Sequence, residues 1–236
     1  ATAYSKPGSA LVAWSQENAA VEVGAERDPI SIDEPLSMFG ITVHELGVHG
    51  ENYYNGQSSE ISVTGNGLYV VGEPGQSIDY LSFREGIASL YQNIAAQTTT
   101  PGVINNFRGT LNTSLAYQGK DFSAAHDVSW RLRALLTAQD GQITPESVTR
   151  ANSLAYDDVL RSYRGAPMRR VAELGLLATY NKDLVYLPGK LNAVAFWNKY
   201  RGNDVMFDFV QSGNFDPTNS RQAAIMHAAT NGKFLQ

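Results

Sequence analysis

Cysteine is absent from this chain of 236 residues. Its absence excludes disulfide bonds, thiolate metal sites and cysteine nucleophiles, so any metal site must use histidine and carboxylate ligands. Long apolar runs are also missing. None approaches the roughly 20 residues that cross a bilayer, and residues 1–13 lack the basic and apolar regions of a signal peptide. We expect a soluble protein that does not enter a membrane; its compartment stays open, with the cytoplasm favoured.

A surplus of basic residues is missing as well, since 18 Lys and Arg face 23 Asp and Glu and give a formal net charge of −5. A protein that binds nucleic acid needs a basic face to displace counterions from phosphates. Nucleic acid is therefore not an expected partner. The sequence does not indicate an oligomeric state.

The first hundred residues combine strand and helix patterns. Short alternating segments at residues 21–23 and 30–32 predict one or two strands of a small sheet. A helix is expected from residue 35 to about 54, because Pro35 suits a first helical turn. Residues 55–77 are rich in Gly, Ser and Asn and predict a long loop with room for a hairpin. Apolar residues at helical spacing predict a second helix over residues 81–95.

The remainder of the chain has a mostly helical pattern. The expected helices span residues 105–117, 123–138, 145–163, 167–180, 188–200 and 217–231. Thr144 and Asp216 are expected caps, because each precedes a proline whose missing N–H is not needed in a first turn. We expect an α+β, mainly helical fold in one domain of residues 1–236. It would hold the small sheet and the site helices in 1–100 and a helical subdomain in 101–236.

Residues 44–49 have the form HExxxH. In the commoner HExxH pattern the two histidines share a helix face and bind zinc, and the glutamate between them is the general base. His44 and His49 are five residues apart, which leaves them about 140° from each other on a regular helix. A π-bulge absorbs one residue and restores a shared face. The spacing predicts such a bulge, and Gly47 would supply its backbone freedom.

Glu85, at the start of the second helix, is the predicted third ligand. A catalytic zinc takes three protein ligands and a water, and Gly86 and Ala88 are small enough for the two helices to approach closely. We predict one zinc ion held by His44, His49 and Glu85, with Glu45 as the general base. The alternative is that HExxxH occurs in a helix without metal and that Glu85 is a carboxylate favoured by the helix dipole.

Two other histidines, His126 and His227, lack any neighbour at ligand spacing. We expect both to be structural. Tyr53 and Tyr54 follow the ligand motif directly and could line an aromatic pocket, although packing is the expected role of one of the two.

Further motifs follow the metal motif in a fixed order. They are an Asn-Gly pair at 55–56, a glycine-rich stretch at 65–75, REGIA at 84–88, RSYRG at 161–165 and KDLVYLPG at 182–189. Taken together, residues 21–197 resemble the tyrosine carboxypeptidase family of HExxxH zinc metallopeptidases. That family includes the microtubule-associated enzyme that removes the terminal tyrosine of α-tubulin and bacterial relatives named for a QEGLA motif. Val48 and Arg84 depart from the family pattern, and Arg84 places a cation beside the third ligand.

The resemblance implies a zincin-like fold and a zinc carboxypeptidase. Its substrate would be the C-terminal tail of a peptide or protein, favouring a terminal Tyr or Phe. Tyr186 is then the candidate donor to the developing oxyanion. Arg161, Arg164 and Lys182 are candidates for binding the terminal carboxylate, although surface salt bridges would use the same residues. Two alternatives stay open: a zinc endopeptidase of toxin or effector type, and a catalytically inactive module that binds peptide tails.

Overall fold

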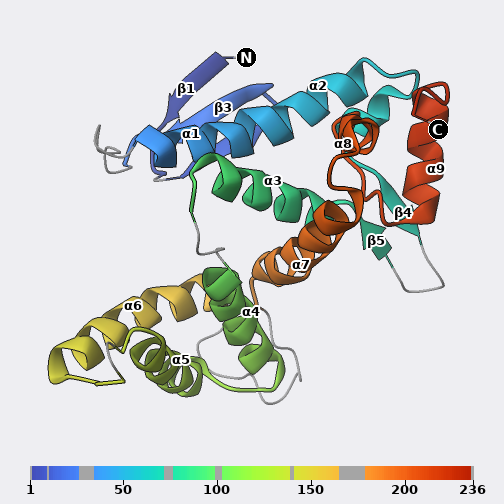
Figure 1. Cartoon of the computed structure of the whole chain (residues 1–236). Helices are drawn as coiled ribbons and strands as arrows, with labels where there is room; N and C mark the ends of the chain where they lie inside the picture. Colours follow the sequence, from blue (N-terminus) through green and yellow to red (C-terminus); the bar gives the residue numbers. More distant parts are fainter. Residues whose placement is uncertain are drawn as a thin grey trace, which may run out of the picture. The chain divides into compact units, whose positions relative to one another are not determined.

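The structure is a computed structural model and describes residues 2–9, 11–26, 35–71, 77–98, 103–138, 141–164 and 179–234. It is α+β and mainly helical, as expected (Figure 1). The chain divides into two compact units, Ala1–Pro101 with Pro188–Gln236, and Gly102–Leu187. The expected subdivision placed all of 101–236 in one helical subdomain, whereas residues 188–236 belong with the N-terminal part. The physical reason is a shared core, described below.

A three-stranded sheet begins the first unit. Its strands are β1 (Thr2–Lys6), β2 (Val12–Ser15) and β3 (Ala20–Gly24), in the order β1-β3-β2. β1 pairs with β3 in parallel and β2 pairs with β3 in antiparallel orientation. β3 confirms the strand predicted at 21–23, the predicted strand at 30–32 lies outside the described residues, and β1 and β2 were not predicted. β2 is an edge strand of this sheet.

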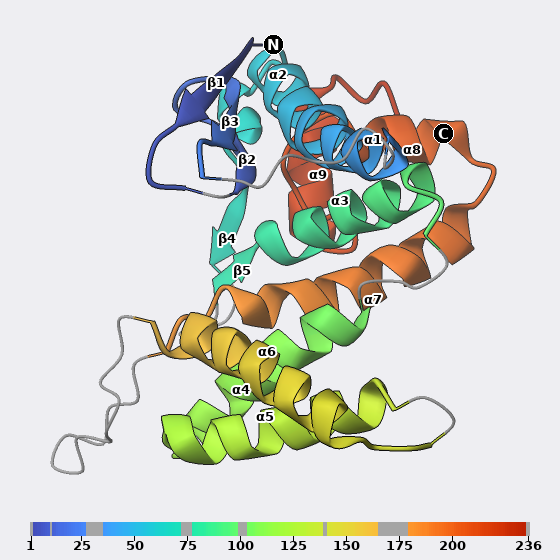
Figure 2. The same ribbon diagram turned by 90° about the vertical axis from the view of Figure 1, so that its left-hand side faces the viewer.

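One continuous helix follows, made of α1 (Pro35–His44), a π-helical turn η1 (Glu45–Gly50) and α2 (Glu51–Gln57). It confirms the helix predicted from residue 35. Figure 2 shows the three-stranded sheet beside this helix, and β2 and β3 contact η1. A 3₁₀ turn η2 (Ser62–Gly65) and an antiparallel hairpin of β4 (Tyr69–Val71) and β5 (Ser77–Asp79) come next, as the predicted loop allowed.

α3 (Leu81–Ala95) has the predicted bounds and forms the centre of the first unit. Three further helices of this part of the chain are α7 (Asp183–Tyr200), α8 (Asp204–Val210) and α9 (Ser220–Ala229). One core joins η1, α3, α7 and α8. Its buried residues are Val48, Phe83, Ile87, Ala88, Ala193, Phe196 and Val210. This core is why the C-terminal residues belong with the N-terminal ones.

α3 and α7 approach so closely that glycine is required at their crossing. A Cβ on Gly86 would lie 2.0 Å from the carbonyl oxygen of Gly189, and one on Gly189 would lie 1.8 Å from that of Ser82. Gly86, next to Glu85, therefore allows another helix to approach closely, as expected. The helix that approaches there is α7, however, and not the helix of the HExxxH motif. α1 contacts α3 at another glycine, Gly40, whose Cβ would lie 2.8 Å from the Gln92 carbonyl oxygen.

The C-terminal region differs from its prediction at three points. α7 begins at Asp183 and contains Pro188, which was expected as its first residue. α8 was not predicted. α9 begins after Asn219, whose side chain accepts the N–H groups of Arg221 and Gln222, and not after Asp216. Asp216 instead accepts the N–H and hydroxyl of Thr218 and closes a turn.

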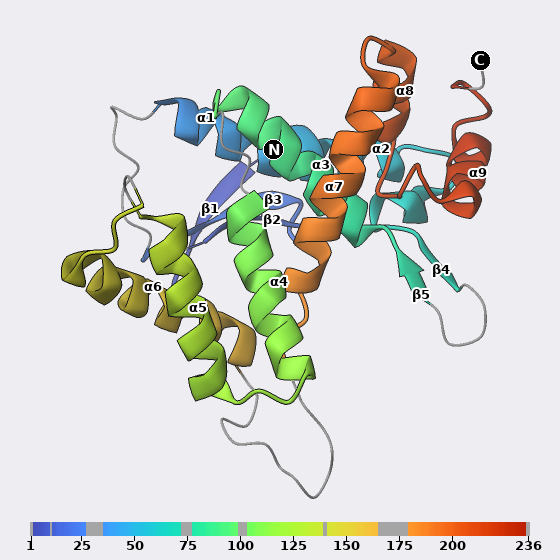
Figure 3. The ribbon, with the colours of Figure 1, turned by 60° about the horizontal axis from the view of Figure 1, so that its bottom comes forward.

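The second unit contains α4 (Val103–Tyr117), α5 (Phe122–Leu136) and α6 (Pro145–Tyr163), which contact one another (Figure 3). All three lie within two residues of the predicted bounds, and Thr144 caps α6 through a reciprocal capping box with Ser147. The helix predicted over 167–180 falls almost wholly outside the described residues. No helix in the described part of the chain is both long and apolar enough to cross a membrane.

Candidate metal centre

The π-helical turn η1 brings the two histidines of the HExxxH motif to one side of their helix. The backbone N–H of Glu51 donates to the carbonyl of Leu46, five residues earlier, so the turn holds one residue more than an α-helical turn. The rings of His44 and His49 then lie 5.0 Å apart, centroid to centroid. The predicted π-bulge is thus confirmed.

Gly47 does not have the expected role in this turn. Its φ is not in the left-handed region that favours glycine. A Cβ at this position would meet only the Val43 side chain, at the ordinary contact distance of 3.8 Å. The π turn therefore forms without conformational freedom that only glycine provides.

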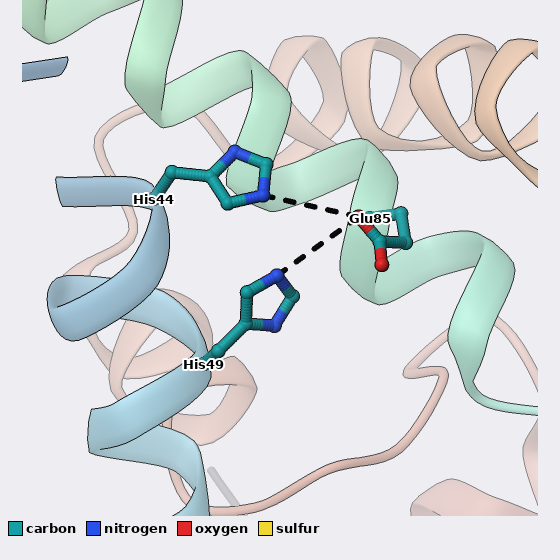
Figure 4. A group of neighbouring side chains, drawn as sticks. All are labelled: His44, His49 and Glu85. Carbon is teal, nitrogen blue, oxygen red and sulfur yellow. Dashed lines mark ion pairs between the residues drawn. The ribbon is translucent and has the colours of Figure 1, made fainter. Parts of the chain in front are cut away.

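Glu85 completes a triad with the two histidines. Its Oε2 lies 3.8 Å from Nε2 of His44 and 3.9 Å from Nε2 of His49, and Figure 4 shows both rings directed toward this carboxylate. All three ligand atoms lie within 4.8 Å of one another, and Glu85 is buried at 8% exposure. Ligands at about 2.05 Å from a tetrahedral zinc lie about 3.3 Å from each other. Small side-chain shifts would therefore close the triad around one ion.

Among the described residues, His44, His49 and Glu85 are the only group of three or more His, Asp or Glu side chains close enough to share a metal ion. Two imidazoles and one carboxylate form a ligand set that suits zinc. His126 and His227 do not take part in it. His126 lies 3.0 Å from the carbonyl oxygen of Asn152, and the ring of His227 stacks on Phe209 at 4.2 Å.

Glu45 is held by the edge strand of the sheet. Its Oε2 accepts the backbone N–H of Trp14 at 2.7 Å, and its Oε1 lies 4.0 Å from Nε2 of His44. Trp14 opposes Val21 in the β2–β3 pair, and its N–H points away from β3 toward η1. One carboxylate oxygen is thus held by the strand, while the other faces the candidate ligand His44.

A second contact supports the π turn from α8. The side-chain amide of Gln211 donates to the carbonyl of Gly47 at 3.2 Å, across 164 residues of sequence. In a regular helix this carbonyl would accept from Glu51, whose N–H is bonded to Leu46 instead. Asn55 in turn donates to the Gln211 carbonyl at 2.8 Å. Neither Trp14 nor Gln211 was predicted as a site residue, because no local pattern connects them with the motif.

Arg84 points into the core of the first unit. Its side chain is fully buried, and Nη1 donates to the carbonyl of Val210 at 3.2 Å. Burial lowers the pKa of this guanidinium to about 9. Arg84 therefore fastens the end of α8 to α3, although its neighbour in sequence, Glu85, is a candidate metal ligand.

An aromatic cluster adjoins Glu45 through Trp14. The Trp14 ring lies 5.9 Å from those of Tyr53 and Tyr54, which are 5.5 Å from each other, and the Tyr54 hydroxyl donates to the Ala19 carbonyl. Both tyrosines are thus packed against the strand that holds the glutamate.

The four remaining candidates lie together in the second unit. Arg161 binds Asp183 through Nε and Nη2 at 2.7–3.0 Å, which raises the pKa of the guanidinium. The guanidinium of Arg164 lies 3.6 Å from the centre of the Tyr180 ring, and the ammonium of Lys182 lies 5.9 Å from that of Tyr186. Arg161 is therefore already engaged by a carboxylate of this chain.

No protein-family model, no curated protein and no solved structure matches this chain.

Proposed function

We propose that this chain is a zinc-dependent metallopeptidase of zincin-like architecture, acting as a carboxypeptidase on tails that end in Tyr or Phe. The observation that carries the proposal is the π turn: it brings His44 and His49 round to Glu85 although regular winding would separate them. This partly buried arrangement uses a rare backbone feature, and such features concentrate at functional sites.

The ligand set fits zinc by type, number and separation. When bound, zinc supplies Lewis-acid polarisation of a peptide carbonyl and acidifies water at neutral pH. The protein contributes the two imidazoles, the Glu85 carboxylate and a site from which much of the solvent is excluded.

Glu45 is the proposed proton carrier. Oε2 accepts the Trp14 N–H, and Oε1, 4.0 Å from Nε2 of His44, is the oxygen proposed to take a proton from the attacking water and to pass it to the departing amine. Two backbone segments set the position of this carboxylate: the π turn that carries Glu45 and the strand whose N–H it accepts.

Two observations support the finer proposal of an aromatic-preferring carboxypeptidase. The first is the resemblance to the tyrosine carboxypeptidases. The second is the aromatic cluster of Trp14, Tyr53 and Tyr54. Because Trp14 also binds Glu45 through its backbone N–H, this aromatic surface adjoins the proposed base. The roles that the resemblance gives to Tyr186, Arg161, Arg164 and Lys182 stay predictions.

The test combines metal analysis with a pair of peptides. The zinc-loaded protein is offered a peptide ending in Tyr and its C-terminally amidated twin. We expect one zinc per chain, release of Tyr from the first peptide and no reaction with the second. Glu45→Gln should keep the zinc and lower kcat by at least about 100-fold.

Other outcomes would separate the alternatives. Cleavage of both peptides would indicate an endopeptidase. Stoichiometric zinc without turnover of any aromatic-ended peptide would indicate a binding module. Full activity of Glu45→Gln would exclude the proposed base.

A further inference from the structure

A cavity of about 660 Å³ in the second unit is lined by three arginines from three helices, Arg108 on α4, Arg133 on α5 and Arg150 on α6. Its volume lies in the range of small-molecule sites. We propose that this cavity binds a small multivalent oxyanion, a phosphate ester or a polycarboxylate. The proposal is independent of the metal centre, since all of the lining residues belong to Gly102–Leu187.

Two of the arginines share a single carboxylate. Arg133 places Nη2 at 2.7 Å and Nε at 2.8 Å from Oδ2 of Asp158, and Nε of Arg108 lies 3.2 Å from the same oxygen. The pKa of Arg108 is lowered by burial and by the charge of Arg133. Because guanidinium groups stay protonated in proteins, the repulsion between them persists. A bound anion would relieve it.

The remaining charges leave the cavity basic. Arg150 is exposed and forms no ion pair with any described residue. Among the described residues of the lining, Glu146 is the one carboxylate, and its pKa is lowered by its own backbone N–H and by Thr144. Counted over the described residues, the lining holds three guanidinium groups and the carboxylate of Glu146, with the Asp158 carboxylate beside it.

The guanidinium groups supply most of the charged N–H groups in the lining. The hydroxyl of Thr137 already donates to the carbonyl of Arg133, and that of Ser147 to the carbonyl of Thr144. Guanidinium forks bind phosphate and carboxylate oxygens in pairs. Donors arriving from three helices suit a branched or tetrahedral anion, and Leu154 and Ala151 add apolar wall for an organic body.

The test uses the chain of 236 residues after removal of metal, so that the anion cannot bind to zinc. Pyrophosphate and citrate are titrated separately by isothermal calorimetry into the unaltered chain, Arg150→Gln and Arg131→Gln. Arg131 is the matched control, because it is an exposed arginine of the same unit that pairs with Asp127 outside the cavity. We expect Arg150→Gln to bind about ten-fold more weakly and Arg131→Gln to bind unchanged.

Tighter binding of pyrophosphate would identify a phosphate ligand, and tighter binding of citrate a polycarboxylate. The proposal is overturned if the unaltered chain binds neither anion, or if the two substitutions weaken binding equally. Both substituted residues are exposed, so both variants should melt at the temperature of the unaltered chain.

Discussion

Glu45 and Trp14 illustrate at the scale of single residues how main chain can hold the carboxylate of a proposed catalytic group. The Trp14 N–H is not part of the β2–β3 ladder, so proline at this position would remove the donor to Glu45 without breaking a sheet hydrogen bond. Trp14→Pro should therefore release the Glu45 carboxylate. We expect kcat to fall at least about ten-fold below that of Trp14→Ala, with zinc still bound at one ion per chain.

Trp14→Ala is the matched control, because it removes the same ring but keeps the N–H. Steady-state hydrolysis of the Tyr-ended peptide and zinc analysis would be measured for both variants. Equal kcat values would show that the hydrogen bond does not position the base.

Gln211 is a second single residue that supports the site, because its side chain binds the π turn between the two candidate histidine ligands. Gln211→Glu keeps the size of the side chain but replaces the N–H donor to Gly47 with a carboxylate oxygen, which repels the carbonyl. We expect the π turn to lose support and the Kd for zinc to rise about ten-fold, the lower end of the effect of outer-shell partners. Titration of zinc into the metal-free chain measures this Kd.

Gln57→Glu is the comparison for that titration. Gln57 lies on the same helix, and its amide binds the exposed Asn66 side chain instead of the π turn. Zinc affinity should be unchanged in Gln57→Glu. An unchanged Kd in Gln211→Glu too would show that the turn holds its shape without this contact.

The helices contain one glycine that a larger residue cannot replace without a clash, Gly86, and one that alanine can replace, Gly47. Gly86 touches the main chain of α7, so a methyl group there must push the two helices apart, whereas Gly47 has room for one. We expect Gly86→Ala to lower the free energy of unfolding by about 3 kcal/mol or more. Gly47→Ala should leave it within about 1 kcal/mol and favour the helix if anything. Urea unfolding of both variants decides between them, and similar losses would contradict the assignment.

Local signals in the sequence were enough to predict several elements, among them those that carry the candidate ligands. Helical spacing gave the bounds of α3, the Thr144-Pro145 pair gave the start of α6, and the five-residue separation of the histidines required the π turn. These features depend on residues within one or two helical turns of each other.

Contacts between distant segments were not predictable in the same way. β1 is stabilised by parallel pairing with β3, and its residues are exposed, so it carries no apolar signature of its own. The bonds from Trp14 to Glu45 and from Gln211 to Gly47 depend on tertiary packing. Pro188 predicted a helix start, but α7 continues through it. The close packing at Gly189 and the buried core residues that follow hold the helix together there.

At the scale of the whole molecule, each unit has a core of its own. The core of the second unit consists of Leu115, Ala116, Ala125, Val159 and Tyr163, all from α4, α5 and α6. All three candidate metal ligands lie in the first unit. The two units share one helix: α7 begins in the second, where Arg161 holds Asp183, and ends in the first, where Ala193 and Phe196 are buried.

This division predicts that zinc stabilises the two units unequally. Ligand at about 100 times its Kd adds about 2.7 kcal/mol to the state that binds it, which for a unit of this size raises Tm by roughly 5–10 °C. Differential scanning calorimetry should show one transition that moves with zinc and one that does not. Val159→Ala, which opens a cavity in the second core, should lower only the transition that zinc leaves in place.

Glu85→Gln supplies the control for this experiment, because it removes a ligand while keeping the shape of the side chain. Its zinc-dependent shift should be largely lost, with the other transition unmoved. A single transition that moves as a whole with zinc would contradict the prediction. It would mean that α7, in spite of the backbone hydrogen bond lost at Pro188, couples the two cores into one cooperative unit.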